Sequence, residues 1–77
     1  MKLTPELQST LESLSDKYHT DGVHFEHIKS RIWVLLNYGM SWVPTKAFDS
    51  LSSAVAWTND MLGRHRTEAA EFERAGG

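Results

Sequence analysis

The residues best able to bind a metal ion or transfer a proton gather in the segment His24-Phe25-Glu26-His27. A zinc site needs three or four ligands that converge on one ion. The surrounding residues favour a β-strand, in which successive side chains point to opposite faces. His24 and Glu26 would then lie on one face and His27 on the other, so this segment cannot build the site. The two remaining histidines stand alone in the sequence, and we expect no metal.

The other polar residues do not indicate nucleophilic catalysis or phosphate binding. Ser50, Ser52 and Ser53 stand at the start of a predicted helix, where hydroxyl groups cap backbone amides, and no Gly-x-Ser-x-Gly motif surrounds any serine. Each glycine before the C-terminal pair stands alone, so there is no glycine-rich phosphate loop. The carboxylates lie in polar stretches, without the desolvation that a catalytic acid needs. We expect neither enzymatic activity nor a cofactor.

One set of basic and aromatic residues remains as a candidate partner-binding site. Aromatic residues and arginine are the usual anchors of protein interfaces, and the same mixture can stack bases and hold phosphates. An alternative interpretation places both tryptophans in the core beneath a helix, because aromatic residues dominate small cores. The set consists of Arg31, Trp33, Tyr38, Trp42 and Lys46.

Composition limits the chain to a single domain, residues 1–77. The chain is 40% hydrophobic and 23% charged, which is typical of ordinary globular domains. The absence of cysteine fits a reducing cytoplasm, and neither a signal peptide nor an apolar run of about 18 to 20 residues is present. We expect a cytoplasmic protein with no membrane partner.

The candidate residues must be positioned by the fold, which we predict to be α+β. Its first part, residues 1–22, is predicted to be a helix and a turn. Thr4 and Pro5 have the types favoured at an N-cap and at the first helical position. Leucines at positions 7, 11 and 14 and Tyr18 then recur at helical spacing and predict one apolar stripe. Gly22 can take the left-handed conformation that ends a helix.

Residues 23–48 are predicted to form three antiparallel strands, because this segment is rich in β-branched and aromatic residues. Pro44 marks the third strand as an edge, since proline cannot donate to a strand ladder. Alternation places Ile32, Val34 and Leu36 on one face of the second strand. The predicted strands are 23–28, 31–37 and 41–48, with turns at Lys29-Ser30 and Tyr38-Gly39-Met40.

A second helix, 49–74, is predicted to begin after an Asp49-Ser50 cap and to pack on the sheet. Its apolar stripe consists of Leu51, Ala54, Val55, Thr58, Met61 and Leu62, with Trp57 at one border. Gly63 could interrupt this helix, which leaves one long helix and a frayed end as alternatives. Residues 75–77 are predicted to be a disordered tail.

The stretch from Trp42 to Trp57 resembles the last strand and helix of the arm-type DNA-binding modules that precede tyrosine recombinases. The similarity covers roughly the last two-thirds of the chain, and its motif is loose. The resemblance implies a sheet that enters the major groove, with Arg31, Trp33 and Lys46 as the matching candidates. The net charge of −2 and the acidic first helix depart from that family, so nucleic acid ranks second among the partners.

In size, charge and lack of reactive motifs, the chain also resembles the small modulators of phages and mobile elements, anti-CRISPR proteins among them. This resemblance is one of type. It implies a protein-binding inhibitor that occupies a surface of a bacterial host complex, and the acids Glu6, Glu12, Asp16 and Asp21 would suit a basic surface on that complex. A homodimer, through the sheet face or the edge strand, is a third alternative.

Overall fold

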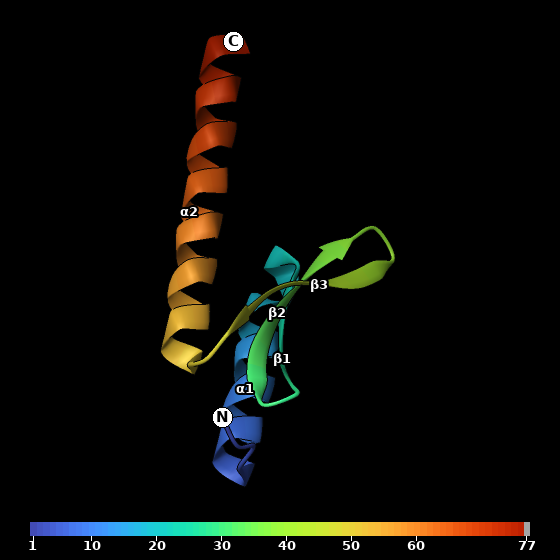
Figure 1. Ribbon diagram of the computed structural model, residues 1–77. Helices are drawn as coiled ribbons and strands as arrows, with labels where there is room; N and C mark the ends of the chain where they lie inside the picture. Colours follow the sequence, from blue (N-terminus) through green and yellow to red (C-terminus); the bar gives the residue numbers. More distant parts are fainter. Residues whose placement is uncertain (77) are drawn as a thin grey trace.

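The computed structural model confirms the predicted α+β order of helix, three-stranded antiparallel sheet and helix (Figure 1). It describes the backbone of residues 1–76 and the side chains of residues 1–65. The elements are helix α1 (Pro5–Tyr18), the 3-10 turn η1 (His19–Asp21), strands β1 (Val23–Ile28), β2 (Arg31–Tyr38) and β3 (Ser41–Phe48), and helix α2 (Leu51–Gly76).

Helix α1 begins and ends as the sequence predicts. The Thr4 hydroxyl accepts a hydrogen bond from the Leu7 amide at 3.1 Å, which satisfies one of the free donors at the helix start. After η1, Gly22 takes a left-handed conformation with φ of 74° and turns the chain into β1.

The sheet has the strand order β1-β2-β3, with both pairs antiparallel. The β1–β2 turn places Lys29 and Ser30 at φ of 49° and 66°, an uncommon conformation for residues other than glycine. The β2–β3 pairing is interrupted by a bulge, because Val34 pairs with Lys46 whereas Leu35 pairs with Pro44. Strand β2 includes Tyr38, one residue beyond the predicted end.

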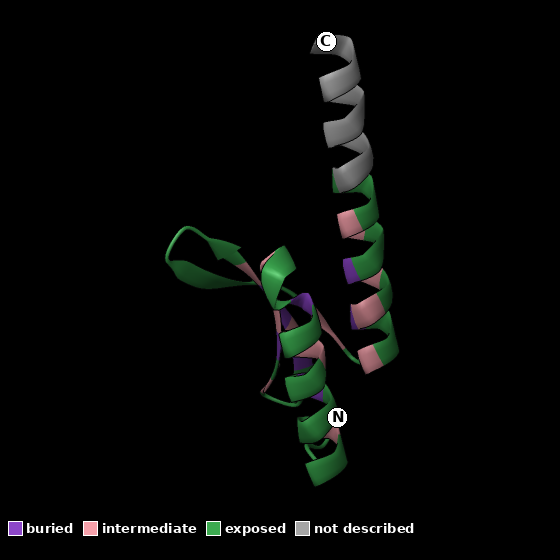
Figure 2. Cartoon of the chain, turned by 180° about the vertical axis from the view of Figure 1, so that it is seen from behind, coloured by how far each residue is buried: buried purple, intermediate pink, exposed green. Residues whose placement is uncertain are grey.

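Both helices pack on the same face of the sheet, and the core lies between them and that face (Figure 2). Alternate side chains of each strand supply the core, and Ile32, Val34 and Leu36 share this face as predicted. Helix α1 covers β1, whereas α2 covers β2 and β3. The fully or nearly fully buried residues of the core are Leu11, Tyr18, Val23, Phe25, Ile32, Val34 and Ala54.

Two polar side chains inside the core have hydrogen-bond partners. The Tyr18 hydroxyl, on α1, donates to the side-chain carbonyl of Asn59, on α2, and so links the two helices. The fully buried Thr58 donates to the Ala54 carbonyl at 2.9 Å. These bonds remove the free-energy cost of burying an unpaired hydroxyl.

Helix α2 begins after Ser50, whose side-chain oxygen accepts from the Ser53 amide at 3.3 Å. The helix continues through Gly63 without a break, which settles the alternatives in favour of one long helix. Residues 75 and 76, predicted to be disordered, belong to this helix, and residue 77 lies outside the described residues. None of the described helices is long and apolar enough to cross a bilayer.

The outer edge of β1 is closed by a side chain of α1. The Ser15 hydroxyl donates to the Phe25 carbonyl at 3.2 Å and accepts from the Phe25 amide at 3.1 Å. One hydroxyl thus replaces the partner strand that an edge residue would otherwise lack.

We predict that Ser15→Ala lowers the free energy of unfolding by about 1–3 kcal/mol, because both backbone groups of Phe25 would lose their partner. Urea denaturation measures this change. Ser13→Ala is the control, since Ser13 is exposed on the same helix and should cost no more than about 0.5 kcal/mol. Equal effects of the two substitutions would contradict this role for Ser15.

Candidate functional site

The sheet face opposite the helices carries a second group of side chains, which we call the open face. Neighbouring residues of a strand point to opposite sides, so the residues between core positions point away from both helices. The open face consists of His24, Glu26 and Ile28 of β1, Arg31, Trp33 and Leu35 of β2, and Trp42, Pro44 and Ala47 of β3.

The open face is strongly apolar although neither helix covers it. Leu35 is only 7% exposed and lies between its cross-strand partners His24 and Pro44. Trp33 is half-buried, and Trp42 is 36% exposed. Leu35 itself is buried, so Trp33 and Trp42 supply the apolar surface that this face presents without a helical layer.

A hollow of about 410 Å³ opens on this face. Its apolar lining comes from Ile28, Trp33 and Pro44, and two cationic residues, Lys29 and Arg31, stand with them. The Arg31 guanidinium is paired with the exposed Asp49 carboxylate at 3.0 Å, a contact that contributes little stability because both side chains are exposed. The hollow is therefore suited to an apolar side chain from a partner.

Trp42 is fixed at one end of the open face by two imidazole rings. The centroid of its ring lies 6.1 Å from that of His19 and 5.8 Å from that of His24. These rings come from η1 and β1, so they connect the base of the β2–β3 hairpin to the rest of the domain. In the structure, both of these histidines thus pack on the aromatic ring of Trp42.

The structure separates Lys46 from the predicted set of basic and aromatic residues. Its ammonium group lies 5.7 Å from the ring centre of Trp57 and 5.9 Å from that of Phe48, on the side of the sheet that α2 covers. Tyr38 is 62% exposed at the end of the hairpin. Of that set, the open face brings together Arg31, Trp33 and Trp42.

Three contributors to the hollow were not among the predicted site residues. Ile28 and Pro44 follow from strand alternation once the register is known. Lys29 could have been predicted to line the hollow only from its place in the turn next to Arg31.

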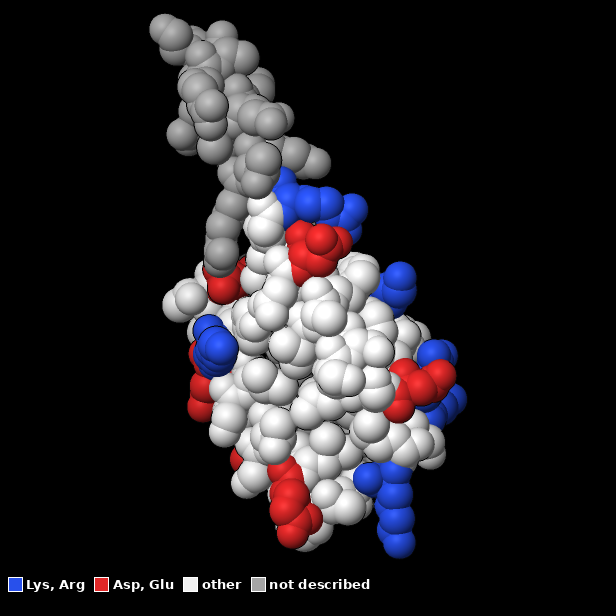
Figure 3. All heavy atoms as spheres, turned by 90° about the vertical axis from the view of Figure 1, so that its left-hand side faces the viewer, with Lys and Arg blue, Asp and Glu red and all other residues white. Residues whose placement is uncertain are grey.

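The four predicted acids are exposed, but they do not form one surface. Glu6 and Glu12 are six residues apart, which places them about 120° apart around α1. Asp16 lies on the flank of Glu12, and Asp21 belongs to η1. Figure 3 shows charges of both signs scattered around a broad uncharged area on the side it faces. No concentrated acidic patch supports the predicted contact with a basic surface.

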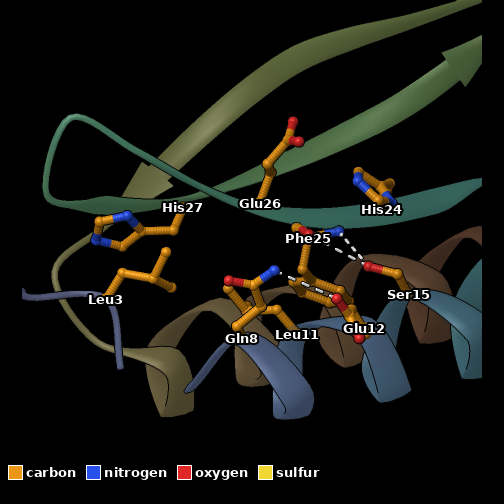
Figure 4. A pocket seen from close by; sticks show the side chains of 9 residues that line it. All are labelled: Leu3, Gln8, Leu11, Glu12, Ser15, His24, Phe25, Glu26 and His27. Carbon is orange, nitrogen blue, oxygen red and sulfur yellow. Dashed lines mark hydrogen bonds between the residues drawn. The ribbon is translucent and has the colours of Figure 1, made fainter. Parts of the chain in front are cut away.

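A second hollow, of about 260 Å³, lies between α1 and β1 (Figure 4). Several of its polar groups have partners: Gln8 donates to Glu12 at 3.4 Å, and Ser15 is bonded to the Phe25 backbone. The His27 ring contacts the Met1 carbonyl oxygen at 2.9 Å. Within the described residues, no three potential ligand side chains come together to hold a metal ion.

Comparisons with protein-family models, with curated proteins and with solved structures find no match to this chain. The open face and its hollow are therefore the features of the chain that bear on function.

We predict that Trp33→Thr lowers the free energy of unfolding by less than Phe25→Ala does, because Trp33 keeps part of its surface exposed whereas Phe25 is buried in the core. Phe25→Ala, in the core, should cost about 3–5 kcal/mol. Chemical denaturation of both variants checks this difference. A cost for Trp33→Thr as large as that for Phe25→Ala would place Trp33 in the core and contradict the open face.

Proposed function

We propose that this chain is a non-enzymatic protein-binding module that contacts its partner through the open face. The observation that carries the proposal is the apolar character of this face, with Trp33, Leu35 and Trp42 on the side of the sheet that neither helix covers. Tryptophan and arginine are enriched among the residues that dominate interface energetics. The hollow beside Trp33 would accept an apolar anchor of the partner.

The proposed contact is made by side chains rather than by addition of a strand. On β1, the backbone of Phe25 is occupied by Ser15. On β3, Pro44 lacks an amide donor and lies next to the bulge, two features that discourage pairing with another chain. The same features count against a homodimer in which two copies of β3 pair.

We further propose that binding inhibits a larger protein complex, because a chain without a reactive group acts on a partner by occupying its surface. A bacterial complex targeted by a phage or mobile element is the most specific form of this proposal. The acids of α1 and the residues of the open face belong to opposite sides of the sheet. A flat partner surface would therefore contact one or the other, and the open face has the stronger anchors.

Binding to DNA is the second candidate because Lys29 and Arg31 stand beside Trp33 at the hollow. Two observations make it weaker. Lys46 lies on the other side of the sheet, and Arg31 is already paired with Asp49. A DNA interface would need several cations on one surface to displace counterions from phosphates.

We predict that Trp33→Thr weakens binding to the partner at least tenfold while the domain stays folded. The measurement is a nuclease-treated pull-down from the native cells, followed by affinity measurements at two salt concentrations. Ser52→Glu, on an exposed position of α2, is the matched control and should bind as the unaltered chain does. Recovery of nucleic acid alone, with affinity that falls steeply with salt, would replace this proposal with DNA binding.

A further inference from the structure

We infer that the end of the β2–β3 hairpin, Tyr38–Val43, inserts into an uncharged apolar cleft of the partner protein. We call this segment the hairpin tip. The inference rests on the proposed function and goes beyond it, because it names a second contact and the chemistry of the surface that receives it.

The hairpin tip holds most of the exposed large apolar side chains of the described residues. Tyr38 is 62% exposed, Met40 is 103%, Trp42 is 36% and Val43 is 41%, whereas the other two members of this group are at the N-terminus. A single exposed apolar residue is ordinary, but four within six residues, with Tyr38 and Val43 on one face of the hairpin and Trp42 on the other, give this projection apolar surface on both sides.

The charge pattern indicates the chemistry of the cleft. No charged residue occurs from Ile32 to Thr45, so the hairpin tip offers no ion-pair partner to a charged surface. Charged groups of a partner would lose hydration against this tip without compensation. An apolar cleft without charges would have no charged group to desolvate, and binding would bury several large side chains of the tip.

The same pattern favours a protein cleft over a lipid surface. Peripheral binding to anionic lipids depends on lysine and arginine near the inserted residues. The tip has neither, the chain carries a net charge of −2, and Lys46, on the same strand, packs against Trp57.

The shape of the hairpin also suits insertion into a concave partner. The hairpin projects beyond the layer of helices, with its turn at the far end (Figure 1). Trp42, itself a residue of the tip, packs against His19 and His24, and the amide of Asn37, which precedes the tip, donates to the Gly22 carbonyl at 3.0 Å. A projection fixed at its base pays less conformational entropy on binding than a mobile loop does. Two such convex tips would bury little surface against each other, which disfavours a second copy as the occupant.

The test places a photo-crosslinking residue at the tip of the full-length chain, as Met40→p-benzoylphenylalanine, in the native cells. We expect an adduct with one protein, and sequencing of the joined peptide should locate it in an uncharged apolar segment. Ser52→p-benzoylphenylalanine is the control and should give no such adduct. Adducts with phospholipid, with another copy of this chain or with a charged segment would overturn the inference, as would no adduct at position 40.

Affinity for the protein identified in this way provides the second measurement. We expect Met40→Asp to weaken binding at least tenfold and Met40→Leu to keep it within twofold, and neither should alter folding because Met40 is fully exposed. If Trp33→Thr weakens binding and Met40→Asp does not, the inserted tip is wrong and the open face remains the site. If neither substitution weakens binding, both proposals fail.

Discussion

The structure depends on the packing of two helices, α1 and α2, against one face of a three-stranded sheet. Alternation along β1 and β2 provides the core face, where Phe25, Ile32 and Val34 meet residues of both helices. Helices α1 and α2 both lie on this core face, and neither covers the other face. Strand β2 carries apolar residues on both of its faces, but the helices cover only one of them. The apolar residues on the other face therefore belong to the open face.

The two sheet edges are closed by different means, and this difference directs recognition to the open face. At β1, a serine of the covering helix satisfies the backbone of Phe25. At β3, no further strand of the described residues pairs with the outer edge, and Pro44 with the adjacent bulge disrupts the regular row of donors and acceptors. Because both edges are interrupted, contacts through the side chains of the open face and of the hairpin tip are favoured over addition of a strand.

Much of this arrangement could be predicted from local signals in the sequence. The N-cap at Thr4, the turn at Gly22 and the period-two pattern of β2 each have a short-range physical cause, and each is confirmed. The sequence grouped Lys46 with Trp42 as candidate partner-binding residues, and the structure places them on different faces of β3. Uninterrupted alternation would place these two residues, four positions apart, on the same face. The extra residue Thr45 changes this, because Lys46 pairs with Val34 while Pro44 pairs with Leu35.

The bulge at Thr45 also connects the core to the proposed binding surfaces. By reversing the alternation of β3, it turns Phe48 and Lys46 toward α2, where Phe48 lies 5.8 Å from Trp57 between ring centres, and leaves Trp42 on the open face. Bulges bend a strand and increase its twist. The part of the hairpin beyond the bulge can thus leave the helical layer, as its projection shows (Figure 1). One inserted residue therefore removes a cation from the open face and presents the uncharged hairpin tip to a partner.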